Sequence, residues 1–323
     1  MSGIDPVPLT FDGVEPTNKP ELVFVVGQPG SGANRLTHTI AADHSPNTAT
    51  VAVDNLAAFH PDFLEVAIWR PLEAPAIFAP QVAEWIGRTL DHARDTKRSL
   101  RFSTSLNSSG PALATAQNFE DAGFSTRVVV IATPEHESLL ATASRYLNAR
   151  RLHLPARFTD RDAHTRGWLG AQALVRDAEA AATVGRLTVI GQNGERLFDA
   201  RREQGFAGAA AALEAAHNAP VSVLEGARWF GELRAITDFA RRAREMAWPV
   251  TEVLIELHEL ALSDVLPNMP VPMESSFAVE QVSRLRGEVE SLSLELPAPP
   301  SVDLSEPSGP IVAPAPSRGG PSL

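Results

Sequence analysis

Residues 21–36 read ELVFVVGQPGSGANRL, and this stretch predicts the fold. The run 22–26 is apolar and rich in valine, which is typical of a strand buried on both faces in a parallel sheet. Gly27 and Gly32 have the G-x-x-x-x-G spacing of a P-loop, a turn whose main-chain N–H groups bind phosphate where a helix begins. We expect that helix over 34–42, so the stretch predicts a phosphate site at the end of the strand.

The two positions after Gly32 depart from the P-loop pattern, which has Lys and then Ser or Thr there. Ala33 removes the ammonium that bridges the outer phosphates, and Asn34 replaces the hydroxyl that helps to hold Mg²⁺ with a weaker amide ligand. Arg35 is the nearest cation, but a helical residue two positions on from Ala33 points elsewhere, so we do not expect it to replace the lysine. A glycine turn without a ligand remains an alternative.

Further apolar runs alternate with helical patterns beyond this stretch. Strands are predicted over 49–53, 99–103 and 126–132, and 187–199 reads as a hairpin around Asn193-Gly194. Helices are predicted from Pro80, over 112–122 and from Pro134. This alternation predicts an α/β fold, a parallel sheet flanked by helices, with any ligand at the carboxyl ends of the strands.

The pattern beyond Pro220 contains only helices, over 224–247, 251–263 and 276–294. In the last helix a 4-3-4-3-4 spacing makes an apolar seam of Ala278, Val282, Leu285, Val289, Leu292 and Leu296. The seam suits a partner helix, but its short length favours packing within the chain. We therefore divide the chain into an extended lead-in (1–20), a P-loop domain (21–218), a C-terminal helical region (219–296) and a disordered tail rich in Pro, Ser and Gly (297–323).

Composition limits the classes of function. The 323 residues include no cysteine, which excludes disulfides, thiolate metal sites and cysteine nucleophiles. A net charge of -11 argues against broad nucleic-acid binding, which needs an excess of Lys and Arg. The N-terminus lacks a secretory pattern and no apolar run reaches the roughly 20 residues of a membrane span, so we expect a cytoplasmic protein without a membrane partner.

Charged residues near the predicted strand ends suggest the chemistry. Asp54 follows the second strand, where a carboxylate can accept a proton or bind metal, although a helix N-cap is an equal alternative. Arginines 145, 150, 151 and 157 could close over a triphosphate, or could form a solvated helix face. His153 and His164 have no partners at metal-site spacing, so we assign no metal site and expect both at the surface.

Six segments, taken together over roughly residues 20–200, resemble the zeta toxin family. They are GQPGSG at 27–32, VDN with HPDF at 53–63, RSLRFSTSLNSSG at 98–110, ATPEHESLLATASRY at 132–146, ARFTDRDAH at 156–164, and the GQNGERLFDA hairpin. Members of that family are P-loop kinases that use ATP to phosphorylate the 3'-hydroxyl of UDP-N-acetylglucosamine, a peptidoglycan precursor. The resemblance implies ATP and Mg²⁺ as cofactors, this sugar nucleotide as substrate, and an antitoxin-like helical protein as partner.

The resemblance also implies roles for single residues. Asp54 matches the catalytic base, and Arg145 and Arg157 match the arginines that bind the transferring phosphate. Ser103 stands where the family has a substrate-contacting Glu, and Asn107 where an arginine often follows. The nucleotide-binding loop would comprise Gly27, Gly30, Ser31, Gly32, Ala33 and Asn34.

The departures at Ala33, Asn34, Ser103 and Asn107 all fall on one pocket, so we expect the kinase activity to be weakened or lost. The alternative is a catalytically inactive protein that binds a nucleotide or a partner on the same fold. A third interpretation is a different small-molecule kinase whose substrate is chosen by residues 103–109.

Overall fold

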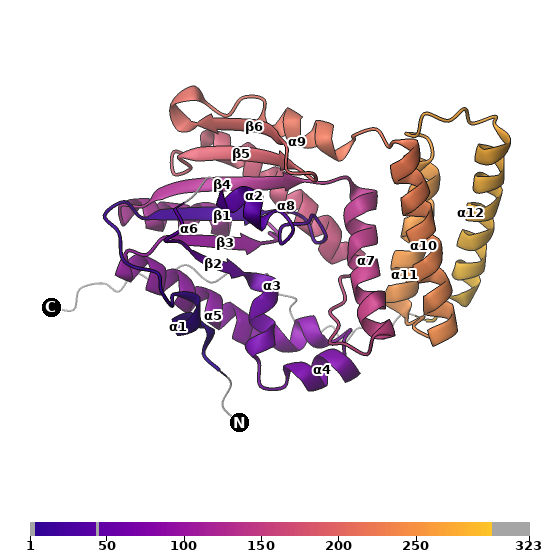
Figure 1. The fold of residues 1–323 in the computed structure, drawn as a ribbon, viewed down its shortest axis with the longest axis horizontal. Coiled ribbons are helices and arrows are strands. Elements are labelled where there is room, and N and C mark those ends of the chain that lie inside the picture. The colour runs from indigo at the N-terminus through magenta and orange to yellow at the C-terminus, as the bar shows by residue number, and fades with distance from the viewer. Residues whose placement is uncertain (1–3, 43–44, 299–323) are drawn as a thin grey trace.

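A six-stranded sheet in the order β2-β3-β1-β4-β5-β6 forms the centre of the molecule (Figure 1). The structure, a computed structural model, describes residues 4–42 and 45–298. The strands are β1 (Glu21–Val26), β2 (Ala49–Ala52), β3 (Leu100–Thr104), β4 (Ser125–Ala132), β5 (Arg186–Gly191) and β6 (Arg196–Arg201). The first five strands are parallel and β6 returns antiparallel to β5, which confirms the predicted sheet and hairpin.

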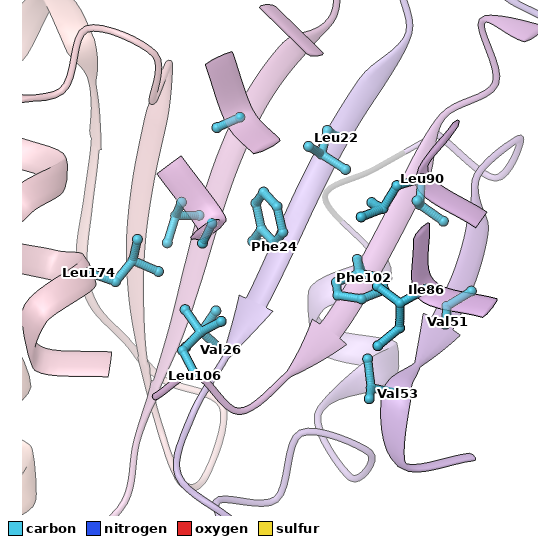
Figure 2. Packing of buried hydrophobic residues seen from close by; sticks show 14 of the residues in the cluster. Leu22, Phe24, Val26, Val51, Val53, Ile86, Leu90, Phe102, Leu106 and Leu174 are labelled. Carbon is cyan, nitrogen blue, oxygen red and sulfur yellow. The ribbon is translucent and has the colours of Figure 1, made fainter. Parts of the chain in front are cut away.

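The central strand β1 is buried on both faces, as its apolar run predicts. Leu22, Phe24 and Val26 face the main core, in which Figure 2 shows them beside side chains of neighbouring strands and of flanking helices. Val23 and Val25 face the opposite side, in a smaller apolar cluster that includes Leu36 and Ile40. Because β1 lies between β3 and β4, the loop that follows it emerges at the middle of the sheet edge.

Helices cover the sheet and continue beyond it. Those up to the end of the hairpin are α1 (Pro6–Thr10), α2 (Thr37–Ala41), α3 (Val53–Leu56), α4 (Phe63–Trp69), α5 (Ala74–Thr96), α6 (Gly110–Asp121), α7 (Glu135–Arg151) and α8 (Arg161–Ala180). Those after the hairpin are α9 (Ala209–His217), α10 (Val223–Ala243), α11 (Trp248–Leu260) and α12 (Ser276–Glu295).

Three sequence expectations are corrected by these bounds. The lead-in is not wholly extended, because Asp5 caps the short helix α1 and buries Val7 in the main core. Helix α5 begins at Ala74, so Pro80 lies inside it rather than at its start. The helix expected over 34–42 is confined to the five residues of α2, since residues 33–36 form a turn.

The C-terminal helices lie away from the sheet, with α10 and α11 beside α7 and α12 on their far side (Figure 1). A second apolar cluster contains side chains of α7 and of all three C-terminal helices. Helix α7 therefore contacts the loop after β1 as well as this bundle. The seam of α12 packs within the chain, because Ala278, Leu285 and Leu292 are buried and the helix lies against α11. The division at 218/219 stays a prediction, and the predicted tail falls outside the described residues from 299 onward.

Candidate functional site

The loop after β1 depends on glycine at its tight positions. Gly30 and Gly32 have φ of +82° and +87°, the left-handed region that L side chains rarely adopt. A Cβ at Gly30 would lie 2.0 Å from the main-chain oxygen of Ser138, so the loop lies directly against α7. A Cβ at Gly27 would lie 2.4 Å from the Ser31 hydroxyl. The glycines therefore serve a close approach of backbones as well as a turn.

Gly30→Ala is expected to lower the free energy of unfolding by about 2–4 kcal/mol, since it combines left-handed strain with a backbone clash. Gly123→Ala is the matched control, because Gly123 has φ of +80° and nothing within 4 Å of its would-be Cβ. The difference between the two variants in chemical denaturation measures the contact with α7. Equal losses would show that the loop is not held against Ser138.

A buried polar network fixes the same loop from behind. The Gln28 side chain is 1% exposed, and its Nε2 donates to the Thr133 main-chain oxygen at 2.7 Å and to Ser138 Oγ at 3.2 Å. The Thr133 hydroxyl in turn donates to the main-chain oxygen of Ser31 at 3.0 Å. Sequence analysis did not identify Gln28 as important, although it lies inside the glycine loop. Its contacts come from α7 and the end of β4.

His164 belongs to this network, and its predicted surface position is wrong. Its side chain is 2% exposed, and Nε2 lies 2.8 Å from Ser138 Oγ. Burial lowers the pKa of His164 from 6.5 to about 4, and the nearby His217 adds to this effect. His153 is exposed, as expected. The two histidines differ because His164 lies on the face of α8 that meets α7, while His153 lies in the loop between α7 and α8.

The low pKa of His164 predicts a pH dependence of stability. Its imidazole stays neutral in the folded protein while the unfolded chain takes up a proton near pH 6.5, so its contribution is complete above pH 6.5 and is lost as the pH falls towards 4. The loss is expected to reach about 3 kcal/mol. The free energy of unfolding, measured by chemical denaturation, should differ less between pH 7 and pH 4.5 in His164→Gln than in the wild type. His153→Gln should show the same difference as the wild type. A His164→Gln difference equal to that of the wild type would refute the assignment.

A cavity of about 320 Å³ opens between the loop and the ends of β2 and β3, and we call it the loop cavity. It brings together most of the predicted site residues, namely Gly27, Gly30, Ser31, Gly32, Ala33, Asn34, Asp54, Ser103 and Arg145. A neighbouring cavity of about 200 Å³, the Arg157 cavity, is lined by Asn107 and Arg157 and shares Asp54 with the first. Its other polar residues include Thr104, Ser105 and Arg166, which sequence analysis did not identify as separate site residues. Asp54 therefore stands at the boundary of two adjoining cavities.

Asp54 lies in the first turn of α3, directly after β2. The residue at the cap position is Ala52, so the alternative of an N-cap for Asp54 is wrong. Its carboxylate accepts a hydrogen bond from Nη1 of Arg157 at 2.5 Å, and both side chains remain partly exposed. The carboxylate thus points towards the cavities on the same sheet edge as the glycine loop.

Only two of the four candidate arginines reach the cavities. Arg145 lies in the wall of the loop cavity, where burial lowers the pKa of its guanidinium, Asp54 opposes this shift and Arg157 adds to it. Solvent still reaches its side chain through the cavity, and the group remains charged at neutral pH. Arg150 donates instead to Glu245 and to the Ile68 main-chain oxygen, and Arg151 lies over the Phe239 ring. Of these four arginines, Arg145 and Arg157 are therefore the two placed to meet a ligand beside Asp54.

The altered loop positions have distinct surroundings. Ala33 lines the loop cavity and also packs against the small apolar cluster beneath it. Asn34 is exposed in the same cavity. The expectation that Arg35 points away is wrong, since its side chain lines the cavity and folds back over Gly32. The error arose because residues 33–36 form a turn, whereas the expectation assumed helical geometry.

The described residues match neither the pattern of a metal-binding cluster nor that of a membrane-spanning helix. In residues 4–42 and 45–298, no group of three or more His, Asp or Glu side chains is arranged to hold a metal ion. Across the same part of the chain, no helix combines the length and apolar character needed to cross a bilayer.

The sequence and the fold of this chain are similar to those of known proteins. The family model described as Zeta toxin matches residues 10–203. A solved structure from the PezAT chromosomal toxin–antitoxin system of Streptococcus pneumoniae is similar with a TM-score of 0.59 and 16% identity, over 73% of this chain and 91% of that one. At this identity the likeness concerns the fold alone.

A structure of the AvrRxo1-ORF1:-ORF2 complex is more distant, with a TM-score of 0.44 at 11% identity, over 85% of this chain and 79% of that one. No match was found among curated protein sequences.

Proposed function

The chain belongs to the zeta toxin family, and from this premise we propose that it binds ATP and transfers its terminal phosphoryl group to a sugar nucleotide. The acceptor we propose is the 3'-hydroxyl of UDP-N-acetylglucosamine or a related compound. The observation that carries the proposal is the meeting of the glycine loop, Asp54 and Arg145 in one cavity. The rate is reduced because side chains of this pocket depart from the family's pattern at positions 33, 34 and 103.

The loop supports nucleotide binding through its main chain. Among the described residues, no acceptor pairs with the main-chain N–H groups of Gly32, Ala33 and Asn34, although all three line the cavity. Consecutive unpaired N–H donors form an anion site, and they do not depend on the side chain at position 33. The positive φ of Gly32 and the close contact at Gly30 keep the loop open to a phosphate chain. The residues present therefore fit a bound nucleotide.

Asp54 is the proposed base for the acceptor hydroxyl. Its carboxylate lies where the loop cavity meets the Arg157 cavity, so a donor in the first and an acceptor in the second would meet beside it. A carboxylate there can take the hydroxyl proton as the oxygen attacks phosphorus. The ion pair with Arg157 orients the carboxylate and keeps a guanidinium next to it.

Arg145 and Arg157 are the proposed clamps on the transferring group. Guanidinium groups neutralise the charge on the equatorial oxygens, which is the main contribution that a protein makes to phosphoryl transfer. Mg²⁺, when bound with ATP, would neutralise charge on the phosphates. Asn34 is the loop residue that would contact it, and the remaining ligands would come from phosphate oxygens and water.

The second candidate function is binding without catalysis, and Ala33 favours it. This side chain packs against apolar neighbours and offers no charge to the outer phosphates. Loss of the lysine, the hydroxyl and a substrate carboxylate should cost several orders of magnitude in rate. The PezAT structure comes from a toxin–antitoxin system, so a protein of this kind could still bind an antitoxin-like helical partner.

One experiment separates the two candidates. The purified protein is incubated with ATP, Mg²⁺ and UDP-N-acetylglucosamine, and phosphorylated sugar nucleotide is measured together with the melting temperature. Product that disappears with Asp54→Ala supports the kinase. A melting temperature raised by ATP without product supports binding alone, since a ligand of the folded state stabilises it. If no product forms and ATP does not raise the melting temperature, the proposed nucleotide site is rejected.

A further inference from the structure

Arg35 occupies an unexpected position beside the glycine loop. Residues 33–36 form a turn, in which the Leu36 N–H donates to the Gly32 main-chain oxygen at 3.1 Å. The Arg35 side chain folds back across this turn, so that its Nη2 would lie 3.1 Å from a Cβ placed on Gly32. The absence of a side chain at Gly32 is therefore what makes room for the guanidinium.

A contact from a distant part of the chain fixes this side chain. Nη2 of Arg35 donates to the main-chain oxygen of Gln192, in the turn of the β5–β6 hairpin, at 3.2 Å. No carboxylate of the described residues lies within ion-pair distance of Arg35. Burial raises the pKa of Glu137 in α7, and the Arg35 guanidinium is near enough to oppose this stronger effect. A guanidinium has five N–H donors, and within the described part of the chain one hydrogen bond, to Gln192, holds this one in place. The group keeps donors for an anion.

Arg35 also lies where two cavities meet. It lines the loop cavity, and it lines a further cavity of about 400 Å³ between α7, the hairpin turn and α10, which we call the α10 cavity. Ala141 is shared by both in the same way. Arg228 and Glu232 contribute to the α10 cavity from a helix that lies beyond residues 10–203, the part matched by the family model. An elongated ligand that enters both cavities must pass the guanidinium.

We propose that Arg35 supplies the phosphate-binding cation that position 33 lacks. The proposal rests on the proposed nucleotide binding and adds a residue that raises the affinity for the nucleotide. The guanidinium would contact the phosphate chain where it leaves the loop for the α10 cavity. Arginine suits this position because its planar fork binds two phosphate oxygens at once and stays charged when partly desolvated.

The test compares ATP and adenosine as probes of the full-length protein by calorimetric titration. Arg35→Ala is expected to weaken ATP binding by about 10- to 100-fold, the range for charge-assisted hydrogen bonds. Adenosine binding should be unchanged, because it has no phosphate. Arg176→Ala is the matched control, since Arg176 is exposed on α8, lines neither cavity and loses the same charge. Its ATP affinity should equal that of the wild type.

A second variant separates phosphate binding from a structural tether to Gln192. Ala33→Lys combined with Arg35→Ala returns a cation to the usual position and should recover most of the lost ATP affinity. A tether would instead give equal losses for ATP and adenosine, with no recovery from the lysine, and this outcome overturns the proposal. If the wild type binds ATP and Arg35→Ala binds it equally well, only the role of Arg35 is rejected. If the wild type does not bind ATP, the proposed function is rejected as well.

Discussion

Ala33→Lys combined with Asn34→Thr is expected to raise the rate of phosphoryl transfer by about 10²–10³-fold or more, the effect of one well-placed donor on developing charge. Both positions line the loop cavity, so the new ammonium and hydroxyl would face the space in which the phosphates are proposed to lie. The lysine stem can cross the apolar cluster that Ala33 now contacts while its charged end stays in the cavity. The rate of product formation from ATP and UDP-N-acetylglucosamine measures the gain.

The control for this prediction is Ala33→Met combined with Asn34→Thr. Methionine has a similar length and reaches the same apolar cluster without a charge, so any gain from packing alone would appear in both variants. A gain that methionine reproduces would show that the charge of the lysine is not its cause. No gain from lysine in a wild type that already forms product would mean that Arg35 supplies the cation. No gain and no product in either protein would mean that Asp54, Arg145 and Arg157 no longer form a competent arrangement, which supports binding without catalysis.

Asp54→Asn, made in the protein that carries the restored loop, is expected to lower the transfer rate by about 10²–10⁴-fold, the usual contribution of a general base. Asparagine keeps the shape of the side chain and loses the ability to take a proton. ATP affinity should change by less than about threefold, because the nucleotide is held by the loop. The Arg157 guanidinium is 41% exposed and stays hydrated without its partner, so stability should change by less than about 1 kcal/mol.

Asp62→Asn is the matched control for Asp54. Asp62 is exposed on the same stretch of chain, before α4, and its side chain makes no capping hydrogen bond. The control should keep the full transfer rate. A rate that falls equally in both variants would point to a general effect of lost negative charge, and a rate that survives in Asp54→Asn would exclude this residue as the base.

Much of the sheet edge follows from local sequence. The Val-rich run 22–26 requires cover on both faces, and the glycines that follow it require a tight turn, whatever the rest of the chain does. Alternation of strands with helices then makes the strands parallel, and parallel strands bring their carboxyl ends to one edge. Chain order after β2 is therefore enough to place Asp54 within reach of the loop.

Other features differ from the sequence expectations because they depend on contacts between distant segments. The histidine of α8 was expected at the surface, yet Ser138 of α7 lies against it and makes it part of the loop's support. Arg150 and Arg151 share a sequence cluster with Arg145 but turn to the C-terminal helices instead. The spacing of residues along a chain predicts which of them share one face of a helix. It does not predict which other element packs against that face.

The sequence by itself determined the class of fold, the glycine loop and the carboxylate facing it, because strand pattern, turn chemistry and chain order are properties of neighbouring residues. The tertiary structure alone decided which cation stands beside the loop. Arg35 turns back over Gly32 because residues 33–36 are not helical and because Gln192, far along the chain, offers an acceptor for its guanidinium. Such a position results from packing between segments, which the order of residues near Arg35 does not specify.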